Sequence, residues 1–221
     1  MSRDKSLTQT GSNNIAAKTQ QKDWAKKLEN LSGEKLGLSD SRRYTSSVGV
    51  GIVYLVIDCS GSMNGNKLQD AINGGKGFAD EAQTRGYTLG LIQFDSAAKH
   101  ILEPQKEITV FYSSIEKLTT GGSTNMAAGI EMAIKSLAET PKSEKVICIV
   151  TDGQPDDRNS TLRVAEEAKR HGIEIMTIGT DDADKEFLEK LATKKELCVK
   201  VASAQLKQGI VSMAKMLPSK T

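Results

Sequence analysis

Four short, predominantly apolar runs constrain the fold of this chain more than any other feature of its sequence. They occupy residues 51–58, 87–94, 145–150 and 172–179, and longer segments with apolar residues at helical spacing separate them. A continuous apolar run of this length is typical of a strand that is buried on both faces of a parallel sheet. Strands that alternate with helices are joined by right-handed crossovers, which cover both faces. The sequence therefore predicts a doubly wound α/β fold.

The segments between these runs complete the predicted architecture. Residues 97–104 follow the second run after a tight turn, which predicts one antiparallel edge strand on a mostly parallel sheet. A short last strand is expected at 197–202. A helix capped by Ser160 or Thr161 is expected to run to His171. Helical spacing predicts the other helices at 67–84, 106–118, 126–139, 184–192 and 205–217.

The chain length of 221 residues fits one globular domain with a tail. Residues 1–20 are polar and bury little, and residues 23–38 contain a short amphipathic pattern around Trp24. We therefore predict a partly flexible N-terminal extension over residues 1–47 and a single domain over residues 48–221. The short helix of the extension either packs back on the domain or binds a partner.

Charge and cysteine content narrow the range of partners and compartments. The net charge of +2 predicts no large basic surface, so nucleic acid is not the expected partner. The three cysteines are odd in number and lie in or beside apolar runs, which favours free thiols in a reducing compartment. Neither a signal-peptide core nor an apolar run of about 20 residues is present in the sequence. We expect a cytoplasmic protein without a membrane partner.

Three loops carry oxygen-bearing side chains where strands are predicted to end. Asp58, Ser60 and Ser62 follow the first run at alternate positions, so their side chains can converge on one point. The loops "GGST" at 121–124 and "TDG" at 151–153 adjoin the same edge of the sheet. Ligands of such sheets bind outside the carboxyl ends of the strands. An all-oxygen set suits a hard cation, Mg²⁺ first and Mn²⁺ or Ca²⁺ next.

These three loops resemble the motifs of a known family. "VIDCSGSM" resembles the Asp-x-Ser-x-Ser signature of the von Willebrand factor type A (VWA) domain, "GGSTNMAAGI" its threonine loop and "IVTDGQP" its aspartate loop. The resemblance extends over about residues 48–217 and implies a Rossmann-like VWA fold. It also implies a metal-ion-dependent adhesion site (MIDAS) at Asp58, Ser60, Ser62, Thr124 and Asp152. Thr124 is preferred over the neighbouring serine because the family has "GST" and "GGT" loops at this place.

The resemblance implies a metal-dependent protein-protein interaction module rather than an enzyme. In the family, the serines and often the threonine ligate the ion directly, and the aspartates bind it directly or through water. An Asp or Glu of a protein partner then completes the ion's shell. The compact chain resembles intracellular bacterial members, which work with AAA+ ATPases of the MoxR or chelatase type or in stress-response systems such as the tellurium-resistance group.

Two other functions are weighed against this interpretation. A metal-dependent hydrolase would use the same cation to activate water, but it also needs a base. His100 and His171 are predicted on an edge strand and at a helix end, apart from the three loops, so neither is expected to act as that base. A nucleotide-binding domain would need a Gly-x-Gly-x-x-Gly turn after the first strand, which is absent from the sequence.

Some of the acidic residues also have ordinary structural explanations. Asp58 could cap the following helix, and Asp152 could be a turn residue. Asp156 and Asp157 are interpreted as solvated loop acids, with a second cation site as the alternative.

Overall fold

The structure is a computed structural model that describes residues 51–140, 143–180 and 183–218. The predicted N-terminal extension over residues 1–47, including its amphipathic helix, lies outside the described residues, so the boundary at residue 48 stays a prediction. Within the described part of the chain, none of the helices has the length and apolar character needed to cross a membrane.

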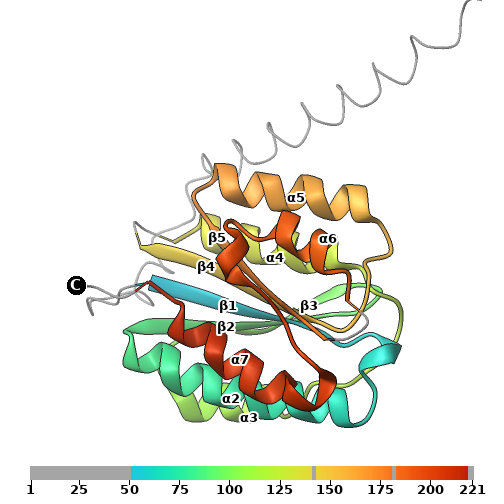
Figure 1. The fold of residues 1–221 in the computed structure, drawn as a ribbon. Coiled ribbons are helices and arrows are strands. Elements are labelled where there is room, and N and C mark those ends of the chain that lie inside the picture. The colour runs from blue at the N-terminus through green and yellow to red at the C-terminus, as the bar shows by residue number, and fades with distance from the viewer. Residues whose placement is uncertain (1–50, 141–142, 181–182, 219–221) are drawn as a thin grey trace, which may run out of the picture. The chain divides into compact units, whose positions relative to one another are not determined.

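A six-stranded sheet in the order β3-β2-β1-β4-β5-β6 forms the centre of the domain (Figure 1). Neighbouring strands run parallel except for β2 and β3, which are antiparallel. This confirms the predicted mostly parallel sheet with one antiparallel edge strand. The strands are β1 (Gly51–Asp58), β2 (Tyr87–Phe94), β3 (Ala98–Gln105), β4 (Glu144–Thr151), β5 (Glu174–Gly179) and β6 (Cys198–Lys200).

Helices cover both faces of this sheet, as the doubly wound fold requires. In Figure 1, one face is covered by α2 (Asn66–Thr84), α3 (Ile108–Ile115) and α7 (Leu206–Lys215). The other face is covered by α4 (Met126–Ala138), α5 (Arg158–Arg170) and α6 (Lys185–Leu191). Short 3₁₀ helices lie in the loops of the described part of the chain: η2 (Gly61–Met63), η3 (Lys195–Leu197) and η4 (Ser203–Gln205).

The central strand β1 is buried along its whole length, which explains its continuous apolar sequence. Val53, Leu55 and Ile57 belong to the apolar cluster on one face of the sheet. Tyr54 and Val56 belong to the cluster on the opposite face. Side chains of a strand alternate between its faces, so a strand covered by helices on both sides needs apolar residues at every position.

The predicted capping residues of α5 are wrong. Asp157 is the N-cap, and its side chain accepts a hydrogen bond of 3.0 Å from the backbone N–H of Ser160. Thr161 is inside the helix, where its hydroxyl donates to the backbone carbonyl of Asp157 over 2.7 Å. Several residues of types that favour N-caps lie within residues 156–161. The course of the backbone, rather than the residue type, determines which of them caps the helix. Asp157 is exposed, as predicted for a solvated acid, and it also caps α5.

Strand register places the predicted site residues at one edge of the sheet. Ile57 pairs with Val150 in the β1–β4 ladder, so Asp58 and Thr151 end adjacent parallel strands. Asp58 also pairs with Phe94, the last residue of β2. The loops after these strands consequently leave the sheet at its carboxyl edge, where the first and third sequence motifs meet.

Candidate metal site

The structure brings the hydroxyls of Ser60 and Ser62 together with the carboxylate of Asp152. The two serine Oγ atoms are 3.1 Å apart, and Ser62 Oγ donates a 2.7 Å hydrogen bond to Asp152 Oδ1. Ser60 and Asp152 are buried, whereas Ser62 is exposed. These residues come from the loop after β1 and the loop after β4, so the predicted convergence of the first and third motifs is observed.

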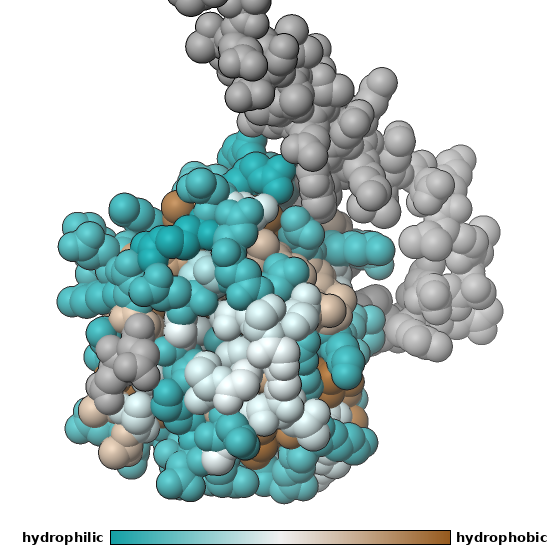
Figure 2. Space-filling view, turned by 90° about the vertical axis from the view of Figure 1, so that its right-hand side faces the viewer, coloured by the Kyte–Doolittle hydropathy of each residue, from teal (hydrophilic) through white to brown (hydrophobic). Residues whose placement is uncertain are grey.

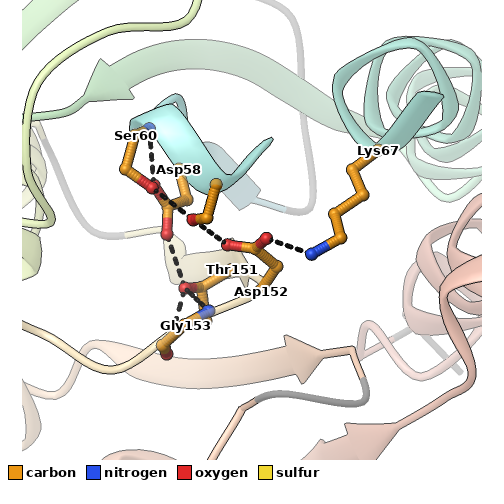
Figure 3. A network of polar contacts seen from close by, with 7 residues as sticks. Asp58, Ser60, Lys67, Thr151, Asp152 and Gly153 are labelled. Carbon is orange, nitrogen blue, oxygen red and sulfur yellow. Dashed lines mark hydrogen bonds and ion pairs between the residues drawn. The ribbon is translucent and has the colours of Figure 1, made fainter. Parts of the chain in front are cut away.

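Asp58 lies beneath this group and is fully buried. Its Oδ1 accepts a 2.8 Å hydrogen bond from the backbone N–H of Ser60, and its Oδ2 accepts a 2.6 Å hydrogen bond from Thr151 Oγ1 (Figure 3). Burial raises the pKa of Asp58 above its usual value, and the hydrogen bonds from Thr151 and Ser60 partly offset that increase. The alternative that Asp58 caps the next helix is wrong, because α2 begins after Gly65 without a side-chain cap.

Asp152 is a buried carboxylate with a different partner on each oxygen. Oδ1 accepts from Ser62, and Oδ2 forms an ion pair of 2.6 Å with Lys67 Nζ. The alternative that Asp152 is only a turn residue is therefore wrong. Sequence reasoning missed Lys67, and it placed Thr151 in the third loop without giving its hydroxyl a role. The signal for Lys67 was weak, because a lysine in the first turn of a helix is usually solvated.

The threonine loop is held beside the first loop by backbone hydrogen bonds. Gly121 N donates to the carbonyl of Cys59 over 2.8 Å, and Gly61 N donates to the carbonyl of Gly122 over 3.2 Å. Gly122 has a φ of +67°, and a Cβ atom there would lie 3.0 Å from the backbone nitrogen of Ser96. A glycine is needed at this position both for its backbone conformation and for the close approach.

Asp156 fixes the loop that carries Thr124. Its Oδ1 accepts from the backbone N–H of Thr124 over 3.0 Å, and its Oδ2 accepts from Ser123 Oγ over 2.6 Å. The backbone N–H of Asp156 donates in return to the carbonyl of Thr124 over 3.0 Å. Asp156 is exposed, as predicted for a solvated acid, and it also holds the threonine loop in place. The role of the Thr124 hydroxyl as a ligand stays a prediction.

The spacing of the oxygens fits a small divalent cation. Mg²⁺ binds oxygens at about 2.1 Å in an octahedron, which puts neighbouring ligands about 2.9 Å apart. The separations between the Ser60 and Ser62 hydroxyls and between Ser62 and Asp152, 3.1 and 2.7 Å, lie on either side of that value. The described residues contain no group of three or more His, Cys, Asp or Glu side chains that could hold a metal ion. A metal site at this edge of the sheet therefore depends on hydroxyl ligands.

The two histidines make their contacts elsewhere. His100 Nε2 lies 3.0 Å from the hydroxyl of Tyr54, and its Nδ1 lies 3.2 Å from Glu103 Oε1. His171 Nε2 lies 3.1 Å from Glu167 Oε1. His100 thus contacts Tyr54 of β1 and Glu103 of its own strand β3, and His171 contacts Glu167 of α5. Both histidines lie on the elements to which sequence analysis assigned them.

The loops around the site expose small, uncharged residues. Gly61, Ser62, Gly122 and Ser123 are all exposed. Figure 2 looks onto the carboxyl edge of the sheet and shows a pale area of near-neutral hydropathy at the middle of this face, bordered mostly by hydrophilic residues and by some hydrophobic ones on the right and below. A ligand that approaches the loops of the site therefore meets small, uncharged residues.

The chain resembles known proteins in both sequence and fold. A sequence model of the von Willebrand factor type A domain matches residues 53–212. An uncharacterized protein of Synechocystis sp. is 29% identical over 145 residues, which is 62% of this chain and 34% of that protein. Matrilin-1 of Bos taurus is 31% identical over 119 residues, which is 48% of this chain and 21% of matrilin-1. The chain thus spans about a third or less of the length of these curated relatives.

Solved structures show the same fold. The vWF domain of the type V pili tip protein Mfa5 from Porphyromonas gingivalis superposes with a TM-score of 0.69 at 17% identity, covering 77% of this chain and 96% of that one. Proximal thread matrix protein 1 from the mussel byssus, with a zinc-occupied MIDAS motif, gives a TM-score of 0.68 at 22% identity, covering 76% of this chain and 46% of that one. Because the family model matches more than half of the sequence and the fold agrees, this chain belongs to the von Willebrand factor type A domain family.

Proposed function

We propose that this domain is a metal-dependent protein-protein interaction module. It binds one divalent cation through Asp58, Ser60, Ser62, Thr124 and Asp152 and uses the ion to capture an Asp or Glu side chain of a partner. The observation that carries the proposal is the spacing of the Ser60, Ser62 and Asp152 oxygens at the carboxyl edge of the sheet. The zinc-occupied MIDAS motif of the mussel relative supports it by analogy.

Each residue of the site has a distinct part in this proposal. Ser60, Ser62 and Thr124 ligate the ion directly through uncharged oxygens, which leaves the ion with most of its positive charge. Asp58 and Asp152 are buried carboxylates, so they supply negative charge without side-chain mobility. The bound cation supplies an electrophilic centre to which a carboxylate oxygen of the partner can bind. We propose Mg²⁺ first and Mn²⁺ or Ca²⁺ next.

The identity of the partner and of its pathway is proposed from resemblance to other family members. The bacterial relative and the bacterial structural neighbour support the prediction of a bacterial protein. An adaptor role for a MoxR- or chelatase-type AAA+ ATPase, or a role in a tellurium-resistance-like stress response, rests on resemblance to intracellular members of the family. Cytoplasmic location and the absence of enzymatic activity likewise stay predictions.

Calorimetry tests the metal-binding part of the proposal. Mg²⁺, Mn²⁺ and Ca²⁺ are titrated into the metal-stripped full chain, its Ser62→Ala variant and a Ser113→Ala control. Ser113 is an exposed serine of α3 whose hydroxyl bonds only its own helix at Val110, so it matches the lost group without touching the site. We expect one site in the wild-type chain and the control, and at least about tenfold weaker binding in Ser62→Ala, the size of effect typical of a lost metal-site contact. Equal binding by Ser62→Ala would contradict the assigned site.

Affinity capture tests the interaction part. The immobilised full chain is exposed to cell extract with Mg²⁺ or with a chelator, and retained proteins are identified. A partner retained by the wild-type chain with Mg²⁺, lost with the chelator and lost with Ser62→Ala is the expected result. Retention that is indifferent to the chelator would refute the metal-dependent mechanism.

A further inference from the structure

Lys67 places a positive charge against the predicted metal site. Its ammonium forms a 2.6 Å ion pair with Asp152 Oδ2, and Figure 3 shows the side chain extending from α2 toward that carboxylate. The Asp152 side chain is fully buried, whereas the side chain of Lys67 retains 25% of its exposure. The ammonium therefore contacts a buried ligand and still lies within reach of solvent.

The position of Lys67 in its helix is electrostatically unfavourable. α2 begins at Asn66, so the lysine is in the first turn, and this turn contains no acidic residue. The N-terminus of a helix carries partial positive charge and favours anions. The close approach of Lys67 to Asp152 offsets this disadvantage, which marks the ion pair as a specific feature of the site rather than an incidental surface contact.

Asp152 divides its two oxygens between the serines and the lysine. Oδ1 faces Ser62, and Oδ2 faces Lys67. A cation bound at the serines and the ammonium of Lys67 would thus share one carboxylate from opposite oxygens. The charges of Asp58, Asp152 and Lys67 together leave the metal-free group with one net negative charge. A bound divalent ion changes that to one net positive charge.

We propose that Lys67 is a tethered cation that lowers the affinity of the site for metal and raises the affinity of the loaded site for a carboxylate. This inference rests on the proposed function, because it needs the metal to bind. Repulsion between the ammonium and a divalent ion a few ångströms away corresponds to about a tenfold loss of metal affinity at the dielectric of water. Without Lys67 the loaded group is electrically neutral and loses its net attraction for an anion. The lysine thereby favours metal binding that is coupled to the partner over metal binding alone.

The test compares variants that separate charge from hydrogen bonding. Lys67→Gln keeps an N–H donor for Asp152 but removes the charge, and Lys67→Arg keeps both. Lys76→Gln is the matched control, because Lys76 lies further along the same helix in a surface ion pair with Glu116. Each full-length variant is titrated with Mn²⁺ by calorimetry. Acetate is then titrated into the Mn²⁺-loaded protein while the relaxation of water protons is followed, with circular dichroism as the check on folding.

The two affinities are expected to move in opposite directions. Lys67→Gln should bind Mn²⁺ about tenfold more tightly than wild type and acetate more weakly, whereas Lys67→Arg and Lys76→Gln should stay near wild type. If wild type binds Mn²⁺ but Lys67→Gln matches Lys76→Gln in both titrations, or binds the metal more weakly, the inference is overturned and the proposed function stands. If wild type binds no Mn²⁺, the proposed function fails, and the inference fails with it.

Discussion

The hydrogen bond from Thr151 to Asp58 offers a quantitative test of how the site is built. The hydroxyl donates to Asp58 Oδ2 over 2.6 Å, and both residues are fully buried. The same hydroxyl oxygen accepts from the backbone N–H of Gly153 over 3.2 Å. Thr151→Val preserves the shape of the side chain and removes both interactions. We expect it to destabilise the metal-free protein because the Asp58 carboxylate loses its hydrogen bond from the Thr151 hydroxyl.

The size of the effect follows from these two contacts. A hydrogen bond to a charged group contributes about 1.5–3 kcal/mol, and an ordinary one about 0.5–1.5 kcal/mol. Thr151→Val should therefore lower the free energy of unfolding by about 2–4 kcal/mol. For a domain of this size, each kcal/mol corresponds to about 2–4 °C in Tm, so a decrease of roughly 5–15 °C is expected.

Urea and thermal unfolding with a chelator present measure this change, and a double-mutant cycle assigns it. Asp58→Ala and the double variant complete the cycle. A coupling energy of at least about 1.5 kcal/mol is expected, because the charged hydrogen bond exists only when both side chains are present. Additivity of the two substitutions to within about 0.5 kcal/mol would refute the reasoning, as would a Thr151→Val variant as stable as wild type.

Three further predictions concern other buried or bridging groups. Burial raises the pKa of Asp58 above 3.8 in the folded chain, so its contribution to stability is fully present below that value and is lost as the pH rises through the raised pKa. Asp58→Asn should remove this part of the pH dependence of Tm in metal-free protein. Parallel curves of Tm against pH for the wild type and Asp58→Asn would contradict this prediction. Asp156→Ala should weaken Mg²⁺ binding several-fold in calorimetry with little loss of Tm, because the exposed Asp156 orders the threonine loop rather than the core; unchanged affinity would oppose this. Burial raises the pKa of both Cys59 and Cys148 to about 12, so native protein should resist iodoacetamide at pH 8 and react only in urea, as peptide mapping can check. Rapid native labelling would contradict their burial.

Much of the fold was predictable because the pattern of apolar residues in most strands is typical of one environment, a sheet covered by helices on both faces. β1, β4 and β5 are largely apolar, and the structure buries most of their residues between two layers of helices. The antiparallel β3 was predictable from the tight turn that precedes it. Helix ends were less predictable. The helix predicted over 106–118 is confined to α3, and Asp157 rather than Ser160 or Thr161 caps α5.

The candidate site was predictable where spacing along one segment sets the geometry. Ser60 and Ser62 converge because they alternate after a strand, and Asp152 joins them because parallel strands end at a common edge. Thr151 and Lys67 were not predictable in the same way. Their contacts depend on the register between β1 and β4 and on where α2 starts, and neither is encoded by a local pattern of residues.

Diffraction from crystals grown with Mn²⁺ tests the central claim most directly. An anomalous difference map locates the ion without reference to any assumed ligand. The account predicts one Mn²⁺ bonded to the Oγ atoms of Ser60 and Ser62, with Asp58 and Asp152 beside it, and no such peak in Ser62→Ala crystals grown in the same way. A peak elsewhere, or no peak at this edge of the sheet at saturating Mn²⁺, would contradict the claim that these residues form a metal site.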